Sequence, residues 1–207
     1  METTDLQAAL IDVRKAYRLL YMYQRRLVDT VDYISQSIGV QIENTYCCFS
    51  GSFFDGRKHY RDYWAWDWLP MYFHEFYCGA HKRLNGLVIN VGIAIQSDTG
   101  FYDAQLSNKQ NIEAYAPVED SETRLLFYLA RNGWKQDFPE FEKLWERSQR
   151  TFALTKGDKQ FAAIALPLSD FMHETLIHAS LKIVAEFFQN NGFPEFMVGE
   201  GIRKQKV

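Results

Sequence analysis

Cysteine, proline and glycine are scarce in this sequence, and each scarcity excludes a class of protein. Among 207 residues there are three Cys, five Pro and twelve Gly. Three irregularly spaced cysteines do not make a disulfide scaffold, and without a CxxC pair neither a zinc ribbon nor a thioredoxin-like site is predicted. The proline and glycine counts are too low for a collagen-like or low-complexity chain. Because 47% of the residues are hydrophobic, we expect a globular protein with a sizeable core.

Most of the short motifs that mark enzymes are missing as well. The sequence has no GxGxxG, GxxxxGK(S/T), GxSxG or EF-hand pattern, and no Glu-x-Lys tripeptide of the kind found in one class of metal-dependent nucleases. The apolar runs are too short to span a bilayer, and the first residues lack the basic start and apolar stretch of a signal peptide. We therefore expect a cytoplasmic protein with no membrane partner, and we predict no cofactor.

The charges are nearly balanced, with 23 Lys and Arg against 26 Asp and Glu and a net charge of -3. Binding to phosphates normally requires a basic surplus, so this balance argues against nucleic acid as a partner. A local exception is a basic stripe on the first predicted helix, formed by Arg14, Arg18, Tyr21 and Arg25. The stripe fits either a solvated face with pairs such as Arg25–Asp29 or the binding of an acidic partner or of phosphates.

Residues 1–38 are predicted to form one long helix, because their apolar side chains recur at alternating steps of four and three. This heptad seam comprises Leu6, Leu10, Val13, Tyr17, Leu20, Leu27, Val31, Ile34 and Ile38. Gln24 fills the polar position of the series, and Gly39 is a C-cap signal. Such a helix would be about 50 Å long, more than the width of a domain of this size. The seam therefore packs along its own domain or against another chain, which could be a second copy.

The rest of the chain reads as a mixture of strands and helices without repeats or linkers. Strands are predicted at 44–49 and 87–96, a returning strand at 101–106 and a hairpin at 151–167. Helices are predicted at 121–132, 138–149 and 169–191, the last with Ser169 as N-cap, and a frayed tail at 197–207. We expect a single α+β domain over 1–207, with an antiparallel sheet packed against the long N-terminal and C-terminal helices.

The segment 60–77 is unusually aromatic, with nine aromatic residues in eighteen positions. In a strand, Trp64, Trp66 and Trp68 would share one face. This face is either part of the core or a partly exposed surface that grips a partner, since Trp, Tyr and Arg dominate interface hot spots. The candidate interaction residues are Arg61, Tyr63, Trp64, Trp66, Trp68 and Tyr72.

Histidines and acids supply weak candidates for a polar site. The metal-ligand candidates, which lack a fixed ligand spacing, are His59, His74, Glu75 and His81. His173 and His178 are five residues apart, so they do not form the HExxH zinc motif. Glu174 and His178 are four apart and share a helix face, which predicts a hydrogen-bonded pair at the helix surface.

The leading hypothesis is a non-enzymatic cytoplasmic protein-binding module, of the inhibitor, immunity or adaptor type found in microbial conflict systems. Its contact surfaces would be the seam of the first helix and the aromatic segment 60–77. The alternative is an enzyme or small-ligand-binding protein with an aromatic-lined pocket, whose polar groups come from Asp67, His74, Glu75 and His178. A third hypothesis is a nucleic-acid-associated protein that uses the basic stripe.

Overall fold

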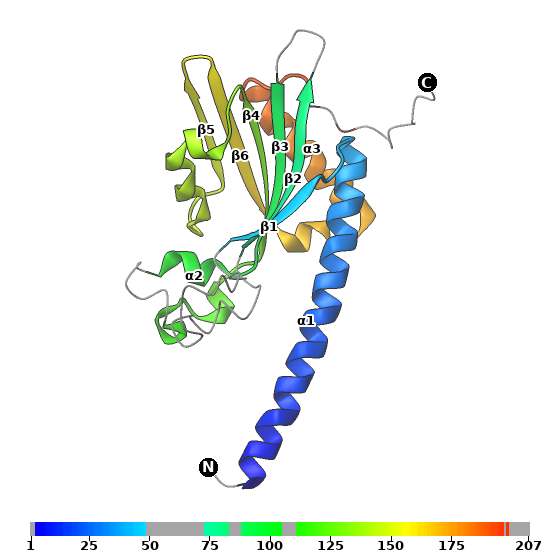
Figure 1. Ribbon diagram of the computed structural model, residues 1–207, viewed down its shortest axis with the longest axis vertical. Helices are drawn as coiled ribbons and strands as arrows, with labels where there is room; N and C mark the ends of the chain where they lie inside the picture. The colour runs from blue at the N-terminus through cyan, green and yellow to red at the C-terminus, as the bar shows by residue number, and fades with distance from the viewer. Residues whose placement is uncertain (1–2, 49–72, 83–87, 105–110, 197, 199–207) are drawn as a thin grey trace, which may run out of the picture.

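A six-stranded antiparallel sheet forms the centre of the computed structural model (Figure 1). The strands are β1 (Asn44–Cys48), β2 (Phe73–Lys82), β3 (Val88–Gln96), β4 (Arg124–Arg131), β5 (Thr151–Lys156) and β6 (Lys159–Pro167), in the order β1-β2-β3-β4-β6-β5. The structure describes residues 3–48, 73–82, 88–104, 111–196 and 198. With the helices α1 (Thr3–Ile38) and α3 (Glu174–Asn190), the sheet confirms the predicted α+β class.

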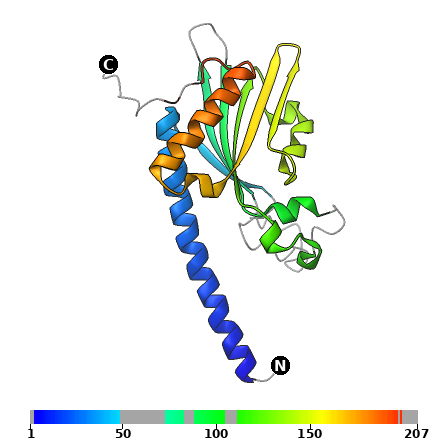
Figure 2. The same cartoon turned by 180° about the vertical axis from the view of Figure 1, so that it is seen from behind.

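Helices α1 and α3 lie on one face of the sheet (Figure 2). The C-terminal part of α1 packs there through Leu27, Val31, Ile34 and Ile38, all of which are buried. The helix ends as predicted at Gly39, whose φ of 72° is easily reached only without a side chain. This face therefore carries the larger of the two apolar cores.

The opposite face of the sheet carries a second, aromatic core beneath a layer of short helices. The layer contains the 3-10 helices η6 (Lys135–Asp137) and η7 (Pro139–Trp145) and, at one end, α2 (Thr99–Asp103); the 3-10 helices η4 (Ile112–Ala114) and η5 (Val118–Asp120), which bury no residue, follow α2 along the chain. Phe101, Phe138 and Phe141 from this layer pack against Tyr128 and Phe161 of the sheet. The sheet is therefore buried on both faces near its centre.

The predicted helix at 121–132 is wrong, because this segment forms β4. Leu125, Phe127 and Leu129 face the α1 side, whereas Leu126 and Tyr128 face the aromatic core. A central strand that is buried on both faces has a continuous apolar run, which periodicity alone does not separate from a buried helix.

Three further element predictions need correction, whereas the strands at 44–49 and 87–96 and the hairpin at 151–167 are confirmed. The expected strand at 101–106 is instead the helix α2, which starts where Asp98 Oδ1 accepts from the amide of Gly100 at 2.8 Å. The element at 138–149 is the shorter 3-10 helix η7.

The last helix begins at Glu174 after the 3-10 helix η8 (Leu168–Phe171), because Phe171 packs into the core against Phe127. Its N-cap residue is His173, not Ser169.

A buried arginine anchors the end of η7 to the sheet. The Arg124 guanidinium, which has no exposed surface, donates to Gln96 Oε1 at 2.9 Å and to the carbonyl oxygens of Leu144 and Trp145 at 3.0 Å each. It also donates to the carbonyl of Gln149 at 2.9 Å. Burial lowers its pKa to about 10. Because every acceptor is a neutral oxygen of the fold, we assign Arg124 a structural role.

Candidate functional site: the projecting half of helix α1

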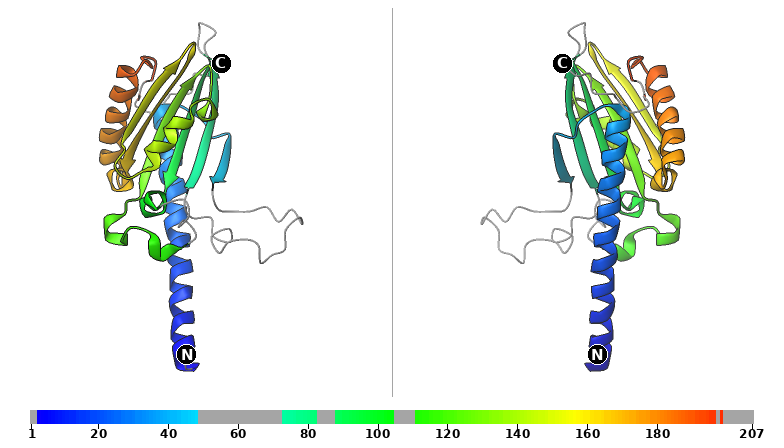
Figure 3. Two further views of the ribbon diagram at one scale, coloured as in Figure 1. Left: turned by 90° about the vertical axis from the view of Figure 1, so that its left-hand side faces the viewer. Right: turned by 90° about the vertical axis from the view of Figure 1, so that its right-hand side faces the viewer.

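Helix α1 leaves the body of the protein about halfway along its length (Figures 1 and 3). From Leu27 onwards its seam is buried, whereas almost every side chain of residues 7–22 is exposed. Gln24 lies half-buried at the point where the helix meets the body. We call residues 7–22 the projecting half and residues 27–38 the core half of α1.

The projecting half exposes large apolar side chains along its length. Each of the following leaves almost half or more of its surface open to solvent: Leu10, Ile11, Val13, Tyr17, Leu19, Tyr21 and Met22. Tyr21 is the most exposed of them, at 69%. With about 200 Å² for one large exposed side chain, they present on the order of 800 Å². One partner of a standard protein–protein interface buries about this area.

Three of these exposed side chains continue the seam that builds the core. Leu10, Val13 and Tyr17 occupy the positions that Val31, Ile34 and Ile38 occupy three heptads later. A helix with an apolar stripe normally buries that stripe against the core. In the projecting half the stripe is exposed, and the described part of the fold offers it no partner.

The predicted basic stripe lies on the same surface. Arg14, Arg18, Tyr21 and Arg25 are all exposed on α1. The intrahelical ion pair that the structure shows nearby joins Lys15 Nζ to Asp12 Oδ1 at 2.9 Å. Counted over residues 3–26, α1 carries Arg14, Lys15, Arg18, Arg25 and Arg26 against Asp5 and Asp12, a surplus of three positive charges. The apolar surface is therefore flanked by positive charge.

Helix α3 holds the core half of α1 through Tyr33. The Tyr33 hydroxyl donates to Glu174 Oε1 at 2.9 Å and lies 3.1 Å from His178 Nε2. Because the one hydroxyl proton goes to Glu174, the Nε2–H form of His178 donates to the Tyr33 oxygen. The hydrogen bond to Glu174 raises the pKa of Tyr33. Glu174 and His178 share a face as predicted, but Tyr33 bridges them, since their own atoms are 3.7 Å apart.

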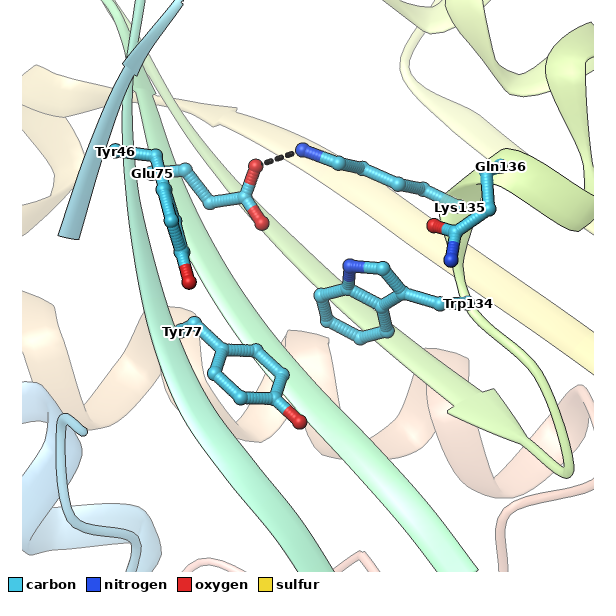
Figure 4. Close-up of a pocket in the computed structure, with 6 residues that line it drawn as sticks. All are labelled: Tyr46, Glu75, Tyr77, Trp134, Lys135 and Gln136. Carbon is cyan, nitrogen blue, oxygen red and sulfur yellow. Dashed lines mark hydrogen bonds and ion pairs between the residues drawn. The ribbon is translucent and has the colours of Figure 1, made fainter. Parts of the chain in front are cut away.

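A second candidate site is a pocket of about 390 Å³ where β1, β2 and η6 meet (Figure 4). Tyr46, Tyr77 and Trp134 form its aromatic walls, and Glu75 and Lys135 lie on its polar side. The Glu75 side chain is buried and forms an ion pair with Lys135 Nζ. The sequence identified Glu75 as a polar candidate, but it gave no indication of Tyr46, Trp134 or Lys135, which tertiary structure brings to it.

Of the metal-ligand candidates, the structure describes the side chains of His74 and Glu75, and it does not bring these two together. His74 and Glu75 are consecutive in β2 and point to opposite faces of the sheet; His74 stacks on Phe76 with ring centroids 4.7 Å apart. His59 and Asp67 lie outside the described residues, and so does the His81 side chain. No three His, Cys, Asp or Glu residues in the described part of the chain are grouped to hold a metal ion.

The aromatic interaction residues predicted from the sequence lie in a part of the chain that the structure does not describe. They are Arg61, Tyr63, Trp64, Trp66, Trp68 and Tyr72. Their assignment to a core or to a contact surface therefore stays a prediction. Among the helices that the structure does describe, none combines the length and apolar content needed to span a bilayer.

Comparisons with known proteins give one family. A family model described as PM0109 matches residues 3–192. A relative from Pasteurella multocida (strain Pm70), named "Uncharacterized protein PM0109", is 36% identical over 168 residues, which cover 70% of this chain and 76% of the relative. No solved structure matches the chain.

Proposed function

The chain belongs to the PM0109 family, and we propose that it is a cytoplasmic protein-binding module, of the inhibitor, immunity or adaptor type, whose contact surface is the projecting half of α1. The observation that carries the proposal is the exposed apolar surface of residues 7–22, which continues a seam that is buried elsewhere in the same helix. Burial of this surface is favourable by about 25 cal/mol for each Å² removed from water, before the costs of association are subtracted.

The charge around this surface defines the kind of partner. Arg14, Lys15 and Arg18 flank the exposed apolar side chains, and α1 carries a positive surplus up to residue 26. A parallel second copy would place like charges side by side, which is unfavourable. We therefore propose a partner protein with an apolar groove and an acidic rim, into which α1 inserts as an amphipathic helix.

Site-specific photo-crosslinking in the host cell tests this proposal. A photoreactive residue is placed at Tyr17 or Tyr21 in the projecting half, and at Glu119 as an exposed control on η5, away from α1. We expect one discrete protein adduct at both Tyr positions and none at Glu119. Mass spectrometry of the adduct separates a foreign protein from a second copy of the chain.

Charge-introducing variants provide the matched control for this experiment. Leu10→Glu should abolish the adduct formed at Tyr17, because it puts a buried negative charge against an acidic rim. Gln7→Glu introduces the same charge on the same helix but removes no apolar surface, so its effect should be smaller. Both side chains are exposed, so neither variant should disturb the fold. If no adduct forms at Tyr17 or Tyr21, the proposal is wrong; an adduct of two copies would replace the acidic partner with a homodimer.

A further inference from the structure

The pocket where β1, β2 and η6 meet has the size of a site for a small ligand and three aromatic walls. Its volume of about 390 Å³ lies within the range of about 300–1,000 Å³ that such sites occupy. The walls are the rings of Tyr46, Tyr77 and Trp134, which face different directions (Figure 4). The Tyr77 and Trp134 rings meet edge to face, with an interplanar angle of 77° and centroids 5.2 Å apart. Rings inclined in this way border a rounded group on several sides, whereas a flat ring stacks on only one of them.

The aromatic walls are held in place by the residues around them. The Tyr128 ring contacts Trp134, with centroids 5.4 Å apart. The Tyr77 hydroxyl donates to Asn90 Oδ1 at 3.1 Å, and Asn90 Nδ2 donates to the carbonyl of Gly133 at 2.9 Å. This chain of hydrogen bonds links β2 and β3 to the residue before Trp134. A site fixed in this way loses little entropy when it binds a ligand.

Gly92 makes room for the ring that contacts Trp134. In the sheet register it lies between Tyr77 of β2 and Tyr128 of β4. A Cβ atom at this position would collide with the Tyr128 ring. Because the side chain is missing, the Tyr128 ring lies over the backbone of β3, where it reaches Trp134.

The polar side of the pocket has no net charge but offers hydrogen-bond donors. Glu75, which is 1% exposed, forms an ion pair with Lys135 Nζ, so the two charges largely cancel at a distance. The Lys135 side chain is 29% exposed and lines the pocket. Its ammonium group has three protons, and Glu75 supplies its one acceptor among the described residues. The Trp134 indole nitrogen points to the same side (Figure 4). An anionic group of a ligand would therefore meet two donors there.

We propose that this pocket binds a small zwitterion of the betaine class, which carries a quaternary ammonium group and a carboxylate. The faces of aromatic rings carry partial negative charge and attract a cation that lies within about 6 Å of the ring centroid. The quaternary ammonium group is rounded and has no N–H to donate, so it lies against the three aromatic walls. The carboxylate then faces Lys135 Nζ.

The ion pair is the reason for a zwitterion instead of a simple cation. Lys135 repels a bare cation, and Glu75 offers it little in return, because its carboxylate is buried and already paired. A ligand with no net charge suits a polar side with no net charge, provided that its negative end points to Lys135. The proposal is independent of helix α1 and of the protein-binding function.

Calorimetric titration of the full chain with matched ligands tests the proposal. The probes are glycine betaine and its homologue with three methylene groups between the charged groups. Each is compared with an isostere in which a tert-butyl group replaces the trimethylammonium group. We expect at least one betaine to bind about fivefold or more tightly than its isostere, because the isostere lacks the charge that the aromatic faces attract. Choline, which lacks the carboxylate, should bind at least about fivefold more weakly than that betaine.

Three results of these titrations would overturn the proposal. Equal affinity for each betaine and its tert-butyl isostere would mean that the rings bury apolar surface without attracting the charge. Affinity for choline that equals or exceeds that for both betaines would mean that Lys135 receives no carboxylate. No binding of either betaine at concentrations up to about 10 mM would mean that the pocket does not take this class of ligand.

Variants of Tyr46 locate the binding in this pocket. Tyr46→Leu removes a ring that is 48% exposed and belongs to neither core cluster, so the chain should fold. Betaine binding should weaken by at least about fivefold, because one aromatic wall is lost. Tyr46→Phe is the matched control, since it keeps the ring face and should keep the affinity within about twofold. Unchanged affinity in Tyr46→Leu would place the site elsewhere and overturn the proposal.

A variant of Lys135 tests the polar side. Lys135→Gln should abolish the preference for betaine over choline, whereas Lys143→Gln, an exposed change of the same kind on η7, should leave it unchanged. Because Lys135→Gln leaves the buried Glu75 without its partner, its folding is checked by circular dichroism. If it unfolds, the comparison of betaine with choline in the parent chain decides the role of the carboxylate. A folded Lys135→Gln chain that still prefers betaine would contradict the placement of the carboxylate at Lys135.

Discussion

The two halves of helix α1 share one sequence pattern but have opposite environments. In the core half, Val31 and Ile34 have no exposed surface, whereas in the projecting half Val13 and Tyr17 leave 47% and 61% of theirs in solvent. Both halves continue the same alternation of four and three residues. An amphipathic pattern therefore indicates a surface that a helix buries, and in the described part of the fold only the core half of α1 buries it.

The surface of the core half builds the fold, whereas the surface of the projecting half is available for binding. The core half is covered by the sheet and by α3, so its side chains contribute to the free energy of unfolding. Most side chains of the projecting half are exposed, so they contribute little to the free energy of unfolding and would contribute more free energy when a partner covers them. Selection for stability alone does not account for large apolar residues at these exposed positions.

The largest expected effect is a stability difference between matched truncations in the two halves. Ile34→Ala should lower the free energy of unfolding by about 2–5 kcal/mol, because it leaves a cavity among fully buried side chains. Leu10→Ala should change it by no more than about 0.5 kcal/mol, since Leu10 is 46% exposed. Urea unfolding monitored by circular dichroism measures both. Equal losses in the two variants would mean that the projecting half is packed against the body.

A smaller effect is expected at the contact between the core half and α3. Tyr33→Phe removes the hydroxyl that bridges Glu174 and His178 but keeps the ring. The stability should fall by less than in Ile34→Ala, because the site is partly open to solvent. Amide exchange of α1 around residue 33 should accelerate more than that of residues 7–22. An unchanged exchange rate around residue 33 would remove Tyr33 from the contacts that hold α1 to α3.

The smallest effect is a pH dependence on the sheet face that the core half covers. Burial lowers the pKa of His74 below its ordinary value of 6.5. Between these two pKa values the unfolded chain binds more protons than the folded chain, so the stability decreases as the pH falls below 6.5. His74→Gln should reduce the difference in stability between pH 7.5 and pH 5, measured by urea unfolding. The exposed His173→Gln should leave that difference unchanged, and equal pH dependence in His74→Gln and the parent chain would contradict the assignment.

The sequence could predict those elements that depend on residues close together in the chain. It could not predict those that depend on tertiary packing. The seam of α1 and the cap at Gly39 follow from spacing, and the structure confirms both. The strand β4 could not be predicted in the same way, because burial on both faces removes the alternation that marks a strand. The start of α3 was missed because the packing of Phe171 into the core overrides the capping signal at Ser169.

The two candidate sites differ in the same way, since one lies on a single helix and the other is assembled from distant segments of the chain. The exposed seam and the basic stripe could be identified because one helix carries them, and only their exposure required the structure. The pocket was predicted only through Glu75, since Tyr46 and Trp134 lie 88 residues apart and reach it through the pairing of β1 with β2 and the turn before η6. No local sequence pattern predicts that these two residues come together in space. The role of Trp64, Trp66 and Trp68 remains a prediction from the sequence.

The most direct test of the central claim is the accessibility of the projecting half inside the host cell. In a chain with Cys47 and Cys48 replaced by Ser, a cysteine is introduced by Tyr17→Cys, with Glu119→Cys as the exposed control and Val31→Cys as the buried control. The native Cys78 is buried, and burial raises its pKa to about 12, so it should react slowly.

Maleimide labelling rates are compared between intact cells and the purified chain. We expect the cysteine at position 17 to react rapidly in the purified chain and at least tenfold more slowly in cells, while both controls keep their rates. Rapid labelling of position 17 in cells would show that the projecting half is uncovered there and would contradict its role as a contact surface.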